Sequence, residues 1–203
     1  MKVLGLDLST HVGYAVIDGA KLIVYGTEHV ENFKAKPNPS DVPDYDKVKT
    51  AQEVAFKVLT FVHAHNIDLV IIEQTNPGKF RTAQKELEFI HFAVVNALQQ
   101  DKLIAHPDLI VKYIDTSKWR SLLGVKLTKE QRLHNKAVKA KTVRGKITPK
   151  HLAVAWANKT FSLELLQKDH DAADAICMAS CAPFIIEQKP TTSVESALGI
   201  KNV

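Results

Sequence analysis

The sequence predicts an α/β domain in which helices flank a mixed five-stranded sheet. Two observations favour this class: three short apolar segments separated by tight turns open the chain, and strand-like segments then alternate with helix-like ones. The first strands are expected over residues 2–8, 12–18 and 21–30, with a tight turn at 18–20. An antiparallel meander therefore leads into strands that are joined by helices.

The later elements follow from hydrophobic periodicity and capping residues. Residues 45–65 carry apolar side chains at helical spacing, and residues 67–73 form the nearly continuous aliphatic run of a buried parallel strand. The other predicted elements are a helix over 82–99, a strand over 109–114, a short helix capped by Thr116 or Ser117, a helix over 149–159 capped by Thr148, and a last helix over 171–184.

The chain is expected to hold one domain over residues 1–185, with a basic insertion near 126–147 and a C-terminal tail over 186–203. Prolines at positions 37, 39 and 43 indicate a loop over 34–46. Within the insertion, residues 128–141 are expected to be helical or partly disordered.

The composition is that of an ordinary globular protein. Of 203 residues, 45% are hydrophobic and 24% are charged. No apolar run approaches the roughly 20 residues of a membrane-spanning helix, and an acid, Asp7, interrupts the opening apolar run too early for a signal peptide. Cys177 and Cys181 are predicted to be buried, reduced thiols rather than metal ligands. We therefore expect a cytoplasmic protein.

Positive charge is concentrated in one segment of the chain. The net charge is only +5, but Glu130 is the single acid between residues 126 and 150. The basic residues there are Lys126, Lys129, Arg132, Lys136, Lys139, Lys141, Arg144, Lys146 and Lys150. Such clustering is typical of proteins that bind a phosphate backbone, although a solvated lysine-rich face without a partner has the same appearance.

Four acids stand at the ends of predicted elements. Asp7 and Glu73 end strands, while Asp171 and Asp174 open the last helix and share one of its faces. Taken singly, each has an ordinary explanation as a turn, ion-pair or helix-start residue. Together they are expected at the carboxyl edge of the sheet, where open α/β sheets place their sites. Clustered carboxylates need a neutralising partner, and Mg²⁺ or Mn²⁺ prefers such oxygen ligands.

Three acidic motifs of the chain resemble those of the RuvC-type Holliday-junction resolvases, in the same order and at about the family spacing. The stretches are residues 5–15 (GLDLSTHVGYA), 70–74 (VIIEQ) and 170–175 (HDAADA). The resemblance covers most of the chain, from about Met1 to Phe184. It implies a ribonuclease-H-like fold and a homodimer that nicks four-way DNA junctions symmetrically. The family's metal-binding and catalytic acids correspond here to Asp7, Glu73, Asp171 and Asp174.

The resemblance also implies DNA-binding residues. Lys79, Phe80 and Arg81 occupy the loop after the second acid, where Phe80 is either a base-stacking residue or a hydrophobic residue at a helix start. Arg144, Lys146 and Lys150 resemble the family's basic stretch before the last acids. The longer segment over 127–143 and the proline-rich loop depart from the bacterial resolvases, as expected of a divergent, phage-type branch in a bacterial or phage-infected cytoplasm.

The mechanism expected from these residues is in-line attack of a water on a DNA phosphate with two metal ions per site, Mg²⁺ or Mn²⁺. Asp7 would bridge the ions, with Glu73 and Asp174 on either side. His170, directly before Asp171, either assists the water or phosphate or is a helix-capping or surface residue, and the same alternatives apply to His11. A stripe of Leu87, Ile90 and Val94 on the second helix is either the dimer interface or part of the core.

Other functions stay open at this stage. Residues 7–13 also resemble the first phosphate turn of actin-like ATPases, but the chain lacks a second glycine-rich loop. A non-catalytic junction-binding protein would not need all four acids. A related nuclease acting on RNA or on flap DNA shares the same residues, because phosphate contacts do not specify the shape of the substrate.

Overall fold

The structure, a computed structural model, describes residues 1–30, 45–74, 81–141 and 144–186. One sheet has the strand order β3-β2-β1-β4-β5. Its strands are β1 (Lys2–Asp7), β2 (His11–Asp18), β3 (Lys21–His29), β4 (Leu69–Glu73) and β5 (Ile110–Ile114). β2 pairs antiparallel with β1 and β3, whereas β4 pairs parallel with β1 and β5. The predicted mixed five-stranded sheet is confirmed.

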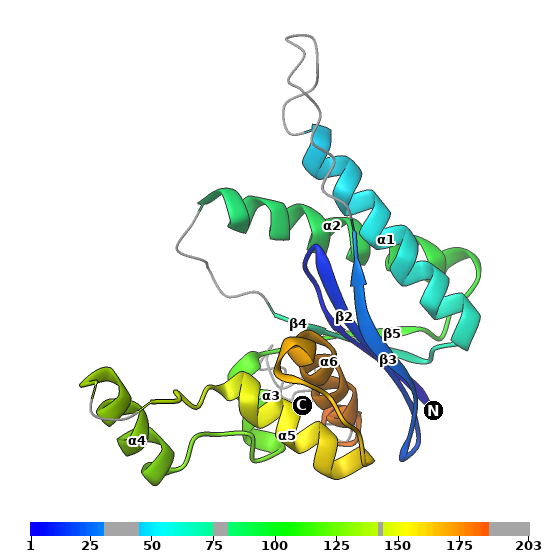
Figure 1. The fold of residues 1–203 in the computed structure, drawn as a ribbon. Helices are drawn as coiled ribbons and strands as arrows, with labels where there is room; N and C mark the ends of the chain where they lie inside the picture. The colour runs from blue at the N-terminus through cyan, green and yellow to red at the C-terminus, as the bar shows by residue number, and fades with distance from the viewer. Residues whose placement is uncertain (31–44, 75–80, 142–143, 187–203) are drawn as a thin grey trace, which may run out of the picture.

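Helices cover both faces of the sheet (Figure 1). They are α1 (Tyr45–His65), α2 (Arg81–Ile104), α3 (Thr116–Leu122), α4 (Lys129–Lys139), α5 (Pro149–Phe161), α6 (His170–Ser180) and α7 (Ala182–Ile186), with a 3-10 turn η1 (Gln167–Asp169) before α6. α1 and α2 lie on one face, and α5 and α6 lie on the other. In the part of the chain that is described, no helix combines the length and apolar character needed to cross a membrane.

Successive side chains along each strand point to opposite faces of the sheet, so the protein has two separate hydrophobic cores. In β1, Leu4 and Leu6 face α1 and α2, whereas Val3 faces α5 and α6. In β4, Val70 belongs to the first core and Ile71 to the second. Because both faces of β1 and β4 are buried, their aliphatic runs are nearly continuous, as expected for central strands.

α6 packs directly onto the backbone of β1 and β2 through two glycines. A Cβ atom at Gly5 would lie 2.2 Å from the carbonyl oxygen of Ala175, and one at Gly13 would lie 2.2 Å from that of Asp171. Any larger residue would push the helix away from the sheet. These glycines therefore set how close the start of α6 comes to the end of β1.

Most predicted elements are confirmed, and several details differ. α1 begins and ends at the predicted residues, and Asn66 ends it with a positive φ of 51°. Asp115, rather than Thr116 or Ser117, caps α3, because its carboxylate accepts from two backbone amides of the first turn. The segment predicted as helical or partly disordered contains α4, capped by Thr128.

The last predicted helix is interrupted. α6 ends at Ser180 and α7 starts at Ala182, because the Cys181 amide donates to Met178 three residues back rather than continuing the α-helical pattern. Cys181 and Cys177 are both buried free thiols, as predicted. The proline-rich segment 31–44 and the tail residues 187–203 lie outside the described residues.

The stripe on α2 that was one option for a dimer interface is part of the core. Ile90 and Val94 have no exposed surface and pack against the sheet. Leu87 lines the cleft at the carboxyl edge of the sheet instead. The helical period identified an apolar face correctly, but it could not say whether the sheet or a second subunit covers that face.

Candidate active site

Asp7 and Glu73 lie side by side at the carboxyl ends of β1 and β4. The parallel register pairs Leu6 of β1 with Ile72 of β4, so the next residue of each strand stands at the same carboxyl edge. Both side chains line one cleft. The sequence-based prediction that these two strand ends converge is confirmed by the geometry, because neighbouring parallel strands end at the same edge.

The start of α6 brings the other two acids to the same cleft. Gly13 pairs with Asp7 in the sheet and lies against the backbone of Asp171, so α6 begins directly beside β1. Asp171 and Asp174 both line the cleft. Asp7, Glu73 and Asp174 can each offer one carboxylate oxygen such that the three oxygens lie within 4.8 Å of one another.

Glu73 is held by two donors from α3. The Thr116 hydroxyl donates to its Oε1 atom, and the Trp119 indole Nε1 donates to the same oxygen at 3.2 Å. Trp119 is fully buried, so its ring is fixed by packing. Two hydrogen bonds to one oxygen orient the carboxylate, as supporting groups around metal ligands usually do.

The charged form of Asp7 is disfavoured in the cleft. Burial raises the pKa of Asp7 well above its ordinary value, and the neighbouring charges of Glu73, Asp174 and Asp171 raise it further. Lys150 opposes these effects. Like charges brought together in a partly desolvated site cannot all stay ionised without a compensating cation.

The pKa of Asp174 is raised as well. Burial, followed by the charge of Glu73, raises its pKa to about 7, while Arg120 and Lys150 act in the opposite direction. Its side chain is almost fully buried, and its Oδ1 atom has no hydrogen-bond partner among the described residues. An orphaned buried oxygen in an acidic cleft is a position that a cation would satisfy.

The donor set fits a hard divalent cation. The converging atoms are carboxylate oxygens, and burial together with the neighbouring carboxylates raises the pKa values of Asp7 and Asp174, so a nearby cation would favour their ionised forms. Mg²⁺ and Mn²⁺ favour oxygen ligands of this kind. Asp7, Glu73 and Asp174 are the residues that could hold such an ion, with Asp171 at the rim.

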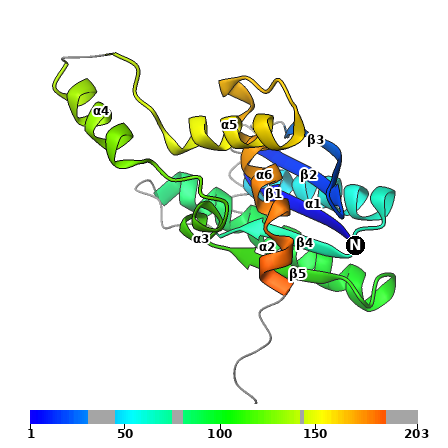
Figure 2. The ribbon, with the colours of Figure 1, turned by 90° about the horizontal axis from the view of Figure 1, so that it is seen from below.

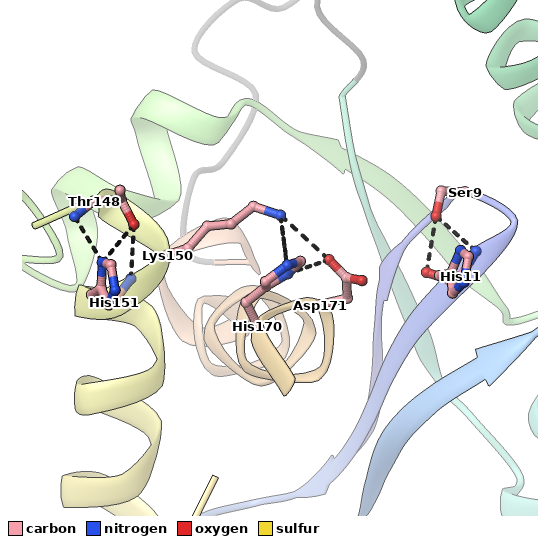
Figure 3. A network of polar contacts seen from close by, with 7 residues as sticks. All are labelled: Ser9, His11, Thr148, Lys150, His151, His170 and Asp171. Atoms are coloured by element: carbon pink, nitrogen blue, oxygen red, sulfur yellow. Dashed lines mark hydrogen bonds and ion pairs between the residues drawn. The ribbon is translucent and has the colours of Figure 1, made fainter. Parts of the chain in front are cut away.

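Lys150 of α5 and His170 lie beside Asp171 at the edge of the cleft (Figure 3). His170 Nδ1 lies 2.5 Å from Asp171 Oδ1, and Lys150 Nζ lies 3.0 Å from the same imidazole nitrogen and 3.6 Å from Asp171. Thr148 and His151 form the capping box that starts α5, which places Lys150 in the first turn of that helix. Lys150 therefore lies at the cleft, and His170 contacts Asp171; the DNA-binding role expected of Lys150 stays a prediction.

Two residues of the cleft, Arg120 and His91, were not predicted from the sequence. Arg120 lines the cleft, and its guanidinium carbon lies 4.9 Å from the Trp119 ring centroid. His91 also lines the cleft, and its Nδ1 lies 3.1 Å from the Tyr113 hydroxyl. Burial lowers the pKa of His91 to about 4, which leaves the ring neutral at neutral pH. No local pattern marks these residues, because their positions depend on how α2 and α3 pack.

Other predicted residues lie elsewhere. Arg144 and Lys146 are exposed between α4 and α5. Lys79 and Phe80 fall outside the described residues, as does the side chain of Arg81, although Arg81 begins α2. His11 packs against His29, with the ring centroids 4.4 Å apart.

Comparisons with known proteins show that this fold is similar to solved structures of RuvC. No family model matches the chain, and no curated protein matches its sequence. A solved structure of Thermus thermophilus RuvC in complex with a Holliday junction substrate is similar at a TM-score of 0.61 and 14% identity, over 92% of this chain and 95% of that one. A second structure of T. thermophilus RuvC is similar at a TM-score of 0.58 and 16% identity, with the same coverage. The predicted ribonuclease-H-like fold is thus confirmed.

The raised carboxyl pKa values predict how stability depends on pH without metal. Asp174 has a pKa of about 7 in the fold, against an ordinary value of 3.8. The folded state therefore binds more protons between these values, so metal-free protein loses stability as pH rises through this window. Asp174→Asn should raise the free energy of unfolding at pH 8 in EDTA by about 1–3 kcal/mol, since one pKa unit corresponds to about 1.4 kcal/mol.

Urea unfolding at pH 4 and pH 8 measures this effect. The gain should largely vanish at pH 4, where the wild-type carboxyl is also neutral. Asp108→Asn, at an exposed position before β5, is the matched control and should change neither value by more than about 0.5 kcal/mol. Equal effects of Asp174→Asn at both pH values would contradict the assigned repulsion.

Proposed function

We propose that this protein is a metal-dependent, structure-selective endonuclease that resolves four-way or other branched DNA junctions by hydrolysing phosphodiester bonds. The single observation that carries the proposal is the convergence of carboxylate oxygens from Asp7, Glu73 and Asp174 within 4.8 Å. The similarity in fold to a RuvC structure solved with a Holliday junction substrate supports the choice of substrate.

Each cleft residue has a role that follows from its contacts. Asp7, Glu73 and Asp174 would hold Mg²⁺ or Mn²⁺, and these ions, when bound, supply Lewis-acid stabilisation of charge during phosphodiester hydrolysis. Thr116 and Trp119 keep Glu73 oriented for that task. The half-buried Asp7 and the buried Asp174 need a nearby positive charge to stay ionised, which a bound cation would supply.

Basic groups at the cleft would position the DNA backbone. Lys150 lies at the rim beside Asp171, and Arg120 lines both the cleft and an adjoining hollow that Lys126 and Arg132 also line. Cations placed beside an acidic metal site attract phosphate while the carboxylates themselves repel it. A continuous path for one DNA strand therefore leads from the cleft toward the basic insertion. Arg144 and Lys146, on the exposed segment before α5, and the loop residues Lys79, Phe80 and Arg81 are assigned to the same DNA surface by resemblance.

α4 extends this basic surface away from the domain. Figures 1 and 2 show the helix standing clear of the sheet, and none of its residues is buried. Its cations recur every three or four residues on one exposed stripe: Lys129, Arg132, Lys136 and Lys139. The Asn135 side chain bonds both the amide and the carbonyl of Ile147, at 2.8 and 2.7 Å, so the helix is tied to the segment before α5. We assign this stripe to the phosphates of a DNA arm.

A second copy of the chain would complete the enzyme. An apolar groove runs between α1 and α2, and Phe56 and Phe92 line it with 67% and 72% of their surface exposed. A four-way junction offers two symmetric cleavage positions, which a two-fold dimer would match. We propose that this groove, rather than the core stripe of α2, packs against the partner and leaves the carboxylate cleft open.

The central test replaces one metal ligand. Asp7→Asn should reduce cutting of a labelled four-way junction in Mg²⁺ or Mn²⁺ by at least about 100-fold, because the ligand charge is lost while the shape is kept. Junction affinity measured in Ca²⁺ should stay within about threefold of wild type. Linear, flap, three-way and RNA substrates complete the panel. Equal activity on linear DNA, or equal loss of binding and cutting, would contradict the proposal.

The α4 stripe predicts a change in salt dependence. Replacing its four cations by Gln should weaken junction binding and reduce the slope of log affinity against log salt by about 3, since each phosphate contact contributes about 0.9. A variant with the same charge loss elsewhere, at Lys21, Lys102, Lys112 and Lys159, should keep most of the slope. Indistinguishable slopes for the two variants would show that the α4 stripe does not contact the DNA.

The apolar groove predicts the oligomeric state. Phe56→Ser with Phe92→Ser should convert a dimer to a monomer, as measured by light scattering during size-exclusion chromatography. The monomer should nick one strand of a junction but lose paired, symmetric cutting. A wild-type monomer, or a dimer that survives both substitutions, would show that the groove is not the interface.

A further inference from the structure

A second cluster of possible ligands lies at the opposite edge of the sheet from the carboxylate cleft. It comprises His63 near the end of α1, Asp101 near the end of α2, and His106 in the connection that follows. α1 leads into β4 and α2 leads into β5, so the cluster stands at the amino ends of these strands. Glu73 ends β4 at its carboxyl end, which separates the two groups by the length of the strand.

The three side chains converge on one another. His63 Nε2 lies 2.9 Å from Asp101 Oδ1, and His106 Nδ1 lies 2.7 Å from Asp101 Oδ2. The two imidazole centroids are 4.7 Å apart. One ligand atom from each residue lies within 4.8 Å of the other two, so a single ion could contact all three.

The local backbone holds these ligands in place. The amides of Ala105 and His106 both donate to the Asp101 carbonyl, at 2.8 and 3.1 Å. These hydrogen bonds hold the residues that follow α2 against the backbone of Asp101. At the end of α1, the Ile67 amide donates to the Val62 carbonyl at 3.1 Å. The Asp101 side chain is only 9% exposed, whereas that of His63 is 49% exposed. The carboxylate of the cluster is therefore buried, and solvent reaches the cluster at His63.

We propose that His63, Asp101 and His106 form a binding site for Zn²⁺ or a chemically similar transition-metal ion. Two imidazole nitrogens and one carboxylate oxygen, with water at the remaining position, are a common ligand set for such ions. The carboxylate cleft offers oxygen only and suits the harder Mg²⁺. The chain therefore carries two sites of different selectivity, and this second site does not depend on the proposed nuclease activity.

One ion could use all three side chains of the cluster. The two imidazole rings have centroids 4.7 Å apart, and each contacts a different oxygen of the Asp101 carboxylate. Because the ligands come from the ends of α1 and α2 and from the connection to β5, the bound ion would fasten both helices to the same edge of the sheet.

The experiment is calorimetric titration of tag-free, full-length protein with ZnCl₂ in excess Mg²⁺, which keeps the carboxylate cleft filled. One Zn²⁺ should bind per chain, and Co²⁺ should give the visible absorption of a four-coordinate site. His63→Ala and His106→Ala should each weaken binding roughly tenfold or more, since even supporting residues around a metal cost that much. Zn²⁺ should raise the melting temperature of the wild type but not that of His63→Ala or His106→Ala, because it stabilises only the folded proteins that bind it.

His65→Ala is the matched control. His65 lies two residues from His63 on the same helix and stacks on Phe61, with centroids 6.2 Å apart. Its substitution should leave Zn²⁺ affinity unchanged, and Mg²⁺-dependent nicking should be normal in the variants at positions 63, 65 and 106. Absence of Zn²⁺ binding, binding that survives loss of His63 and His106, or an equal loss in His65→Ala would overturn the proposal.

Discussion

The repulsion among carboxylates gathered at one edge of the sheet governs this structure. Asp174 is buried and Asp7 is half-buried beside Glu73, and burial together with the neighbouring carboxylates raises the pKa of both side chains. Lys150 and Arg120 reduce this repulsion without removing it. An arrangement that costs stability persists when it serves a site. A divalent cation bound among these carboxylates would lift that cost, and metal binding would then be coupled to folding.

Close packing between α6 and the sheet is what creates that arrangement. Gly13 allows the backbone at Asp171 to touch β2, and Gly5 does the same for Ala175 beside β1. Because α6 lies directly against the sheet, Asp174, the fifth residue of the helix, comes next to Asp7. The parallel pairing of β1 and β4 fixes Glu73 independently. The cleft therefore depends on backbone contacts, which tolerate little change in side-chain size.

Local patterns predicted much of this molecule, and long-range packing explains what they missed. Asp7 and Glu73 were identifiable because acids at the ends of apolar strands are unusual and because sheet topology brings neighbouring strand ends together. Arg120 was not, because nothing in its neighbourhood reveals that α3 borders the cleft. Ile90 and Val94 formed a visible apolar stripe, but periodicity does not say which surface covers it.

The most direct test is anomalous diffraction from crystals of the protein soaked with Mn²⁺. The account predicts an anomalous Mn²⁺ peak in the cleft, coordinated by carboxylate oxygens of Asp7, Glu73 and Asp174. No anomalous signal in the cleft, or an experimental structure in which Asp7 and Glu73 point to different sides of the sheet, would contradict it.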